Sequence, residues 1–242
     1  MRIIKLNAID STNLFLRSLS IDTNVEDFTV VVAKHQTKGR GQMGTVWSSQ
    51  DAKNLTFSVF KRFDNLKLDQ HFVISMVASL AVINTLKKLN LPKLSVKWPN
   101  DILSANKKIC GILIENVIKQ NKVAGSVVGI GLNVNQVDFS GLPQASSILN
   151  ITGASYDLDE LLQSILNELK ILFDLVESNQ FETIKTTYES FLFRKDKPST
   201  FENAEGLFSG FIKGVSNEGL LKVLLEDDVL ETFDLKTIKL LY

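Results

Sequence analysis

Glycines alternate with long polar side chains in one segment near the start of the chain, QTKGRGQMG at residues 36–44. Gly39, Gly41 and Gly44 would let a ligand approach the backbone and meet successive N–H groups. Arg40 adds a planar guanidinium, which suits phosphate or carboxylate. The segment lacks the GxxxxGK[ST] pattern of a P-loop and opens no predicted helix, as a dinucleotide fingerprint would. It indicates a ligand-binding loop, with a flexible surface loop as the alternative.

A second cluster brings together a cation, an aromatic ring, a stiff turn and a carboxylate in Lys97-Trp98-Pro99-Asn100-Asp101. The cluster lies between two predicted strands. If Asp101 is buried beside Lys97, its charge needs a partner or a metal ion. The plainer interpretation is a polar turn around a buried tryptophan.

Lys108 opens a nearly continuous apolar strand, KICGILIE, that ends at Glu115. Gly111 inside this strand indicates close approach by a ligand or by another backbone, whereas an edge-strand lysine that opposes aggregation is the alternative. Cys110 follows two residues after Lys108, so we expect it on the same face of the strand. Because no base lies near it in sequence, Cys110 is better explained as a small buried hydrophobe than as a nucleophile.

A glycine–amide segment and two histidines are the remaining candidates for chemistry. Two glycines end a later strand beside amide side chains, GIGLN at residues 129–133, which a ligand could lie against, although this pattern is weak by itself. His35 and His71 form no metal-binding or triad pattern, and the chain has no GxSxG, HExxH or CxxC motif.

Composition excludes several classes of protein. The 242 residues include 27 Lys+Arg and 27 Asp+Glu, so the net charge of zero gives no general reason to expect a nucleic-acid partner. A single cysteine excludes a disulfide framework and fits a reducing cytoplasm. The first residues lack the pattern of a signal peptide, and the longest apolar stretch, residues 72–86, is too short and too interrupted to span a bilayer. We therefore expect a cytoplasmic protein without a membrane partner.

The elements that must position these residues form a mixed α+β pattern. Alternation and β-branched runs predict strands at residues 3–6, 28–33, 55–60 and 94–98 and a hairpin at 109–117 and 123–132. Helical spacing predicts helices at residues 69–89, with Asp69 as the cap, and at 158–178 and 181–193. Short strands at residues 206–215, 220–225 and 229–233 predict a small β-barrel. We accordingly divide the chain into residues 1–193 and 194–242.

Taken in order, these motifs resemble those of the biotin protein ligase family. KWPND at residues 97–101, followed at the observed distance by Lys108 and Gly111-Ile112-Leu113, is the most specific element. The other matching pieces, which together extend the resemblance over essentially the whole chain, are Ser11-Thr12-Asn13, Gln36, Gly39-Arg40-Gly41, Trp47, Gly129 to Asn133, and residues 214–219.

The resemblance implies a catalytic domain like that of class II aminoacyl-tRNA synthetases, with a mixed sheet and helices, followed by an SH3-like β domain. It implies formation of biotinyl-5′-AMP from biotin and Mg-ATP, and then transfer of biotin to one lysine of a biotin carboxyl carrier domain of a carboxylase. The implied catalytic residues are Arg40, Lys108 and Asp101.

The resemblance also assigns binding residues. Those implied for biotin are Ser11, Thr12, Asn13, Gln36, Arg40, Gly41, Gln42, Trp47, Lys108, Gly111 and Gly129. Those implied for ATP or the adenylate are Gly39, Arg40, Lys97, Asn100, Asp101, Lys108 and Asn133, with Mg²⁺ near Asp101 and Asn133.

Two departures from the family pattern carry expectations of their own. Gln42 stands where many members have a second arginine, so we expect retention of the adenylate to differ here. Ser11 comes within the first dozen residues and leaves no room for the N-terminal DNA-binding domain of bifunctional members, so we expect no repressor function and no nucleic-acid partner. A monomer and a homodimer both remain open.

Two other functions remain as alternatives. A lipoate–protein ligase or octanoyltransferase would share the catalytic fold, and the transferase would need Cys110 as its nucleophile. A non-catalytic biotin-binding module would bind biotin without adenylating it. The GRG and KWPND motifs argue against the first, and the presence of Arg40, Lys108 and Asp101 argues against the second.

Overall fold

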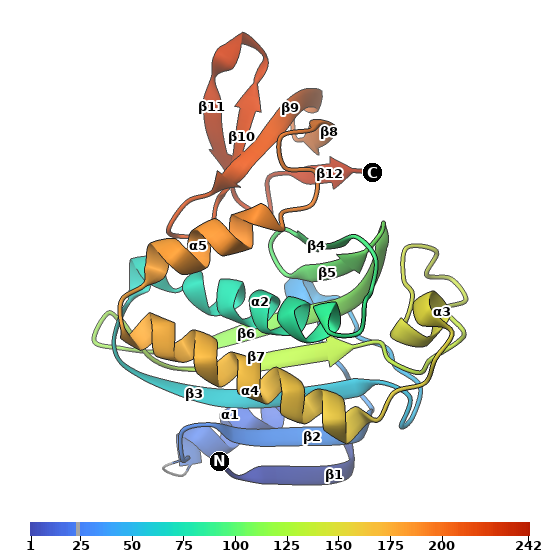
Figure 1. Cartoon of the computed structure of the whole chain (residues 1–242). Coiled ribbons are helices and arrows are strands. Elements are labelled where there is room, and N and C mark those ends of the chain that lie inside the picture. Colours follow the sequence, from blue (N-terminus) through green and yellow to red (C-terminus); the bar gives the residue numbers. More distant parts are fainter. Residues whose placement is uncertain (23–24) are drawn as a thin grey trace.

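A mixed sheet of seven strands dominates the computed structural model, which describes residues 1–22 and 25–242 (Figure 1). The strand order is β1-β2-β3-β7-β6-β5-β4. Only the first pair, β1 and β2, is parallel within these described residues; the other neighbours are antiparallel. The strands are β1 (Ile3–Ile9), β2 (Thr29–Gln36), β3 (Leu55–Lys67), β4 (Leu94–Lys97), β5 (Asp101–Ser104), β6 (Lys107–Lys119) and β7 (Lys122–Leu132).

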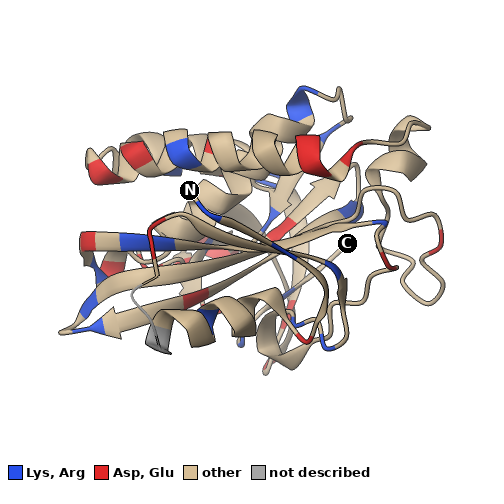
Figure 2. Ribbon diagram, turned by 90° about the horizontal axis from the view of Figure 1, so that it is seen from below, with Lys and Arg blue, Asp and Glu red and all other residues tan. Residues whose placement is uncertain are grey.

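Helices cover both faces of this sheet (Figures 1 and 2). The helices α2 (Val73–Lys87), α4 (Leu158–Glu177) and α5 (Phe181–Ser190) lie on one face, and α1 (Thr12–Asp22) lies on the other; a short α3 spans Ile148–Thr152. The helix α2 is apolar around nearly its whole circumference because it is enclosed between the sheet and α4. In contrast, α4 buries one apolar stripe and carries charged residues of both signs on its outer side.

The predicted helix start at Asp69 is wrong. Residues Leu68–Gln70 form a 3₁₀ turn, and α2 begins only at Val73, after Phe72, which gives no side-chain cap. Burial of the apolar helix replaces capping as the source of its stability. The other predicted helices and the hairpin of β6 and β7 are confirmed, although α5 ends at Ser190 rather than at residue 193. No helix among the described residues combines the length and the apolar character needed to cross a membrane.

The C-terminal part of the described chain forms a second, antiparallel sheet with the order β11-β10-β9-β8-β12. Its strands are β8 (Pro198–Asn203), β9 (Gly206–Val215), β10 (Leu221–Leu225), β11 (Leu230–Phe233) and β12 (Lys239–Leu241). Phe208 stacks between Phe201 and Phe233, with ring centroids 5.4 and 5.5 Å apart. The predicted mixed α+β class is confirmed, and β5, β8, β12 and α3 are elements that the sequence analysis did not predict.

The second sheet docks on the first through Trp98 of the KWPND segment. The Trp98 indole N–H donates a hydrogen bond of 2.9 Å to the carbonyl of Gly219. Gly219 has φ +92°, and a Cβ there would lie 2.3 Å from the ring of Phe72. The Glu189 carboxylate at the end of α5 accepts a hydrogen bond of 2.9 Å from the Val215 N–H. The KWPND segment and the C-terminal sheet are therefore joined by direct hydrogen bonding and close packing.

Candidate functional site

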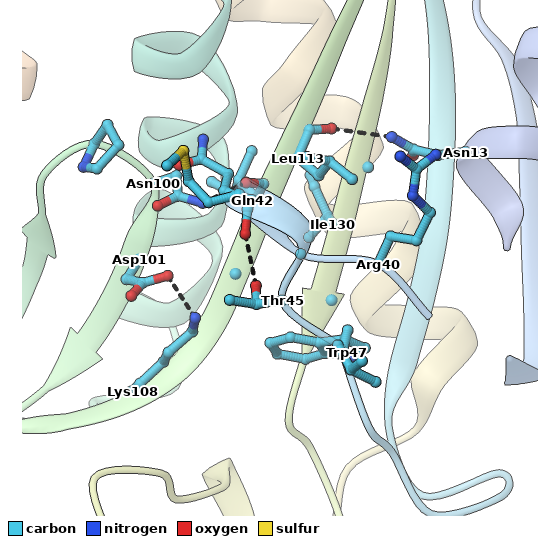
Figure 3. Close-up of a pocket in the computed structure, with 18 of the residues that line it drawn as sticks. Asn13, Arg40, Gln42, Thr45, Trp47, Asn100, Asp101, Lys108, Leu113 and Ile130 are labelled. Carbon is cyan, nitrogen blue, oxygen red and sulfur yellow. Dashed lines mark hydrogen bonds and ion pairs between the residues drawn. The ribbon is translucent and has the colours of Figure 1, made fainter. Parts of the chain in front are cut away.

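One pocket of about 320 Å³ gathers the predicted site residues (Figure 3). It lies between the loop at residues 39–47, the start of α1, the KWPND turn, and strands β6 and β7. All the predicted residues line it except Gly39 and Asn133. Its lining also includes residues that had no predicted role: Met43, Thr45, Val46, Phe57, Trp98, Pro99, Ile112, Leu113, Ile130, Gly131 and Leu235.

The loop at residues 39–47 folds back on itself beside the pocket. The Gly41 N–H donates to the Thr45 carbonyl at 2.7 Å, and the Trp47 N–H donates to the Gly39 carbonyl at 3.0 Å. A Cβ at position 39 would lie 2.3 Å from the Trp47 carbonyl oxygen, and one at position 41 would lie 2.4 Å from Thr45 Oγ1. Gly39 therefore permits the close crossing of the loop and does not itself line the pocket.

Trp47 lies over two glycines of the central hairpin. A Cβ on Gly111 of β6 would lie 3.0 Å from the indole, and a Cβ on Gly131 of β7 would lie 2.5 Å from it. The two positions are paired across the strands, so together they provide a flat bed for the ring. The Trp47 indole nitrogen is buried and has no hydrogen-bond partner among the residues that the structure describes. The indole thus provides an apolar wall and a free donor at the same place.

Lys108 and Asp101 form an ion pair at one end of the pocket (Figure 3), with 2.6 Å between Nζ and Oδ1. Their side chains are only 34% and 18% exposed. The sequence analysis had considered Lys97 as the partner of this carboxylate. Burial lowers the pKa of Lys97, the Asp101 carboxylate opposes that shift, and Lys108 adds to it. Two ammonium groups and one carboxylate make this end cationic, which suits anionic oxygens.

A β-bulge decides which side chains of β6 face the pocket. Ile102 of β5 pairs with Cys110 of β6, but the next residue of β5, Leu103, pairs with Lys108. One residue of β6 is therefore left without a partner on β5. The extra residue breaks the alternation of side chains, so Lys108 and Gly111 both line the pocket. The expectation that Cys110 shares the face of Lys108 is therefore wrong. The thiol is fully buried, and burial raises its pKa far above the usual range.

Neutral hydrogen-bonding groups occupy the opposite end. The Thr12 N–H and hydroxyl donate to Gln36 Oε1 at 2.8 and 3.1 Å. The hydroxyl of Ser58, on β3, lies 2.8 Å from Thr12 Oγ1 and 2.6 Å from Asn13 Oδ1. Gly129 leaves room for this network, because a Cβ there would lie 2.2 Å from Asn13 Oδ1. A preorganised polar cluster thus forms beneath Thr12 and Asn13.

Arg40 does not lie at the cationic end. Its guanidinium points toward Asn13, away from Lys108 and Asp101 (Figure 3). There it faces Glu115 of β6, with 3.8 Å between Nη1 of Arg40 and Oε1 of Glu115. The two predicted catalytic cations therefore lie at different ends of the pocket, and Glu115 is a charged neighbour of the site that the motif comparison did not assign.

Two predicted binding residues serve the structure in other ways. Asn133 is 4% exposed, donates its side-chain N–H to the Ser146 carbonyl at 3.0 Å, and lies outside the pocket lining. The Asn100 side chain lines the pocket but donates to the Ile112 carbonyl at 2.7 Å, which fixes the KWPND turn on β6.

The fit of a metal ion rests on Asp101. Among the described residues that line the pocket, Asp101 is the only carboxylate, and no three described His, Cys, Asp or Glu residues are grouped to hold a metal ion. Mg²⁺ is commonly bound by one or two carboxylates together with substrate phosphates. The pocket therefore suits a cation that arrives with a phosphate substrate better than a resident metal.

Comparison with known proteins identifies the family. Residues 6–133 match the model of the biotin/lipoate A/B protein ligase family. The bifunctional ligase/repressor BirA of Bacillus spizizenii is 30% identical over 94% of this chain and 70% of its own length, and BirA of Bacillus subtilis is 31% identical over 83% and 62%. The biotin protein ligase of Aquifex aeolicus in complex with biotin and ATP has a TM-score of 0.81 at 29% identity, covering 99% of this chain and 98% of that one. The chain belongs to the biotin/lipoate A/B protein ligase family.

Proposed function

We propose that this chain is an ATP-dependent biotin protein ligase. It forms biotinyl-5′-AMP from biotin and Mg-ATP and then transfers biotin to a lysine of a biotin carboxyl carrier domain. The observation that carries the proposal is the polarity of the pocket, which has uncharged hydrogen-bonding groups at Thr12 and Gln36, beside the Arg40–Glu115 ion pair, and a cationic end at Lys108. The likeness to the Aquifex aeolicus ligase with biotin and ATP supports the same pair of substrates.

Biotin fits the neutral end and the indole wall. Its ureido ring is an uncharged set of donors and acceptors, which hydroxyl, amide and backbone groups such as those of Ser11, Thr12 and Gln36 can bind. The apolar ring and chain of biotin would lie against Trp47 and the floor of β6 and β7. This places the biotin carboxylate in the direction of Lys108.

Adenylation follows from that placement. An oxygen of the biotin carboxylate attacks the α-phosphorus of ATP, a new P–O bond forms, and the bond to the β-phosphate oxygen breaks to release pyrophosphate. Lys108 would stabilise the negative charge on the phosphoryl oxygens. Asp101 holds Lys108 in place, and its carboxylate is the group that would bind a Mg²⁺ ion carried by the ATP phosphates, which would offset their negative charge.

The transfer step needs no nucleophile from the enzyme. The amine of the carrier lysine attacks the carbonyl of the mixed anhydride, an amide bond forms, and AMP leaves with the electron pair of the broken C–O bond. A transferase that works through Cys110 is not supported, because this thiol is fully buried outside the pocket and its pKa is raised. We further propose that residues 194–242 form a separate module that completes the nucleotide end through Leu235.

Biotin-dependent exchange of labelled pyrophosphate into ATP tests this function, with lipoate and octanoate as parallel substrates. We expect exchange with biotin alone. Exchange with lipoate instead would redirect the assignment to lipoate ligation. Tight biotin binding by calorimetry without exchange would identify a binding module.

A further inference from the structure

Glu115 is the charged residue next to the site that the proposed chemistry does not use. It lies on β6 in alternation with Gly111 and Leu113, so its side chain points to the same face of the sheet as the pocket. The side chain is only 15% exposed. A carboxylate held this far from solvent at the edge of an anion-binding pocket needs partners of its own.

Two guanidinium groups and one amide surround this carboxylate. Oε1 faces two guanidiniums, that of Arg17 at 3.2 Å and that of Arg40 at 3.8 Å. Oε2 accepts a hydrogen bond of 3.0 Å from the Asn13 amide, which also donates to the Leu113 carbonyl. Glu115 therefore keeps a hydrogen-bonded cation and an amide donor even if Arg40 moves away.

The two arginines differ in how tightly they are held. Arg17 forms a hydrogen bond to Glu115, whereas Arg40 is an ion-pair neighbour at a longer distance. Both arginines are about half exposed, at 49%. The Arg40 guanidinium is half in solvent and lies 3.8 Å from the carboxylate, so solvent weakens this ion pair, and an anion with more charge than one carboxylate can draw Arg40 from Glu115.

We infer that Glu115 is a positioning residue for Arg40. Its carboxylate holds the Arg40 guanidinium at the biotin end of the pocket, Arg40 exchanges Glu115 for an anionic group of the substrates, and Arg17 stays behind as the counter-ion of Glu115. This inference rests on the proposed function, because it takes the α-phosphate of ATP as the anion that Arg40 moves to.

The exchange predicts effects of opposite sign for two neighbouring substitutions. Glu115→Gln removes the charge that competes for Arg40, so the Kd of an ATP analogue falls about two- to fivefold. Arg17→Ala leaves Arg40 as the sole guanidinium on Glu115, so the same Kd rises by about the same factor. The variant that carries both substitutions lacks the Glu115 carboxylate, so loss of Arg17 has no further effect there. Its Kd should match that of Glu115→Gln alone.

The experiment is calorimetric titration of α,β-methylene-ATP into the full chain saturated with biotin, because this analogue binds without transferring its α-phosphoryl group. Asp159→Asn is the matched control: it removes an exposed carboxylate that pairs with Lys5 outside the pocket lining, and it should leave the Kd unchanged. Thermal melting of each variant reports whether it folds.

The inference is supported if the two single substitutions shift the Kd in opposite directions and the variant with both has the Kd of Glu115→Gln. Shifts in the same direction, as expected if Glu115 only braces the fold, or no shift at all, would overturn it. Pyrophosphate exchange by the wild-type chain is measured in parallel. Normal exchange without opposite shifts removes the role of Glu115 alone, whereas absence of both exchange and analogue binding removes the proposed function and the inference with it.

Discussion

Lys108 and Asp101 define the charge at the cationic end of the pocket, since they lie 2.6 Å apart and both are partly buried. Replacing one member of such an ion pair is destabilising, because the charge of the other member is left without a partner. The consequence for catalysis is direct: the ammonium is fixed before the phosphate arrives, so little reorganisation is needed when charge develops.

Lys108→Ala should lower the rate of biotin-dependent pyrophosphate exchange by about 10²- to 10³-fold, as expected for loss of one fixed electrostatic stabiliser. Lys107→Ala is the matched control, because Lys107 is the exposed neighbour on β6 and does not line the pocket. Near wild-type exchange in Lys108→Ala would remove Lys108 from the catalytic residues.

Gln42→Arg should slow the escape of the adenylate. Gln42 lines the pocket, and its Oε1 is buried without a hydrogen-bond partner in the described part of the chain. An arginine there would add a charge-assisted hydrogen bond to the phosphate, which is worth about 1.5–3 kcal/mol and slows release about tenfold or more. The measurement is the release rate of labelled biotinyl-5′-AMP during a chase with unlabelled biotin. Gln42→Met controls for size, and equal rates in all three proteins would show that position 42 does not govern retention.

Most of the pocket could be predicted from the sequence because its residues occur in short contiguous motifs around Arg40, Asp101 and Lys108. Ser58 and Glu115 could not. Each acts through contacts with residues more than forty positions away, and each has an ordinary residue type for a strand. Asn133 shows a second limit of motif reasoning, since its side chain hydrogen-bonds to the Ser146 carbonyl outside the pocket lining, and its predicted role toward the adenylate stays a prediction.

At the scale of the elements, the central hairpin of β6 and β7 supplies the floor of the pocket. Its strands were predicted from their apolar runs, and their pairing from the short connection. The bulge opposite β5 was not predictable, because nothing in the local sequence marks a single extra residue in a ladder. Because of this extra residue, the side chain of Lys108 points into the pocket.

Gly131→Ala should weaken biotin binding at least about tenfold, since the added methyl would collide with the Trp47 indole at 2.5 Å and lift it from the strands. Gly125→Ala, on the same strand, is the control. Its methyl would press on Phe60 at 2.9 Å, away from the pocket, so it should lower the melting temperature and leave the biotin Kd unchanged. If calorimetry gave equal biotin Kd values for Gly131→Ala and wild type, Trp47 would not form a wall of the site.

At the scale of the whole molecule, the site is shared between the two sheets. Leu235 reaches the pocket from the C-terminal part, and the Tyr242 ring lies 5.0 Å from the Lys97 ammonium. Burial raises the pKa of Tyr242 and the Asp101 carboxylate raises it further, so the phenol stays neutral beside this ammonium at pH 7. The position of the C-terminal sheet therefore affects the end of the pocket that holds Lys97 and Lys108.

Trp98→Phe should raise the KM for ATP several-fold with a smaller change in kcat. It leaves the Gly219 carbonyl without its donor, at a cost of about 1–3 kcal/mol, and so loosens the docking of the second sheet. Gly206→Ala is the control: it strains the C-terminal sheet at φ +130° but has no neighbour within 4 Å. If both variants changed the KM equally, the joint at Trp98 would have no special part in ATP binding.

The hydrogen bond from Trp98 to Gly219 also has a consequence for protein engineering. The pentapeptide that lines the pocket is the same one that holds the second sheet, so the two halves of the chain are not interchangeable parts. A chimera that takes its C-terminal half from a relative inherits a working site only if the incoming turn offers a carbonyl to Trp98 and bare backbone to Phe72.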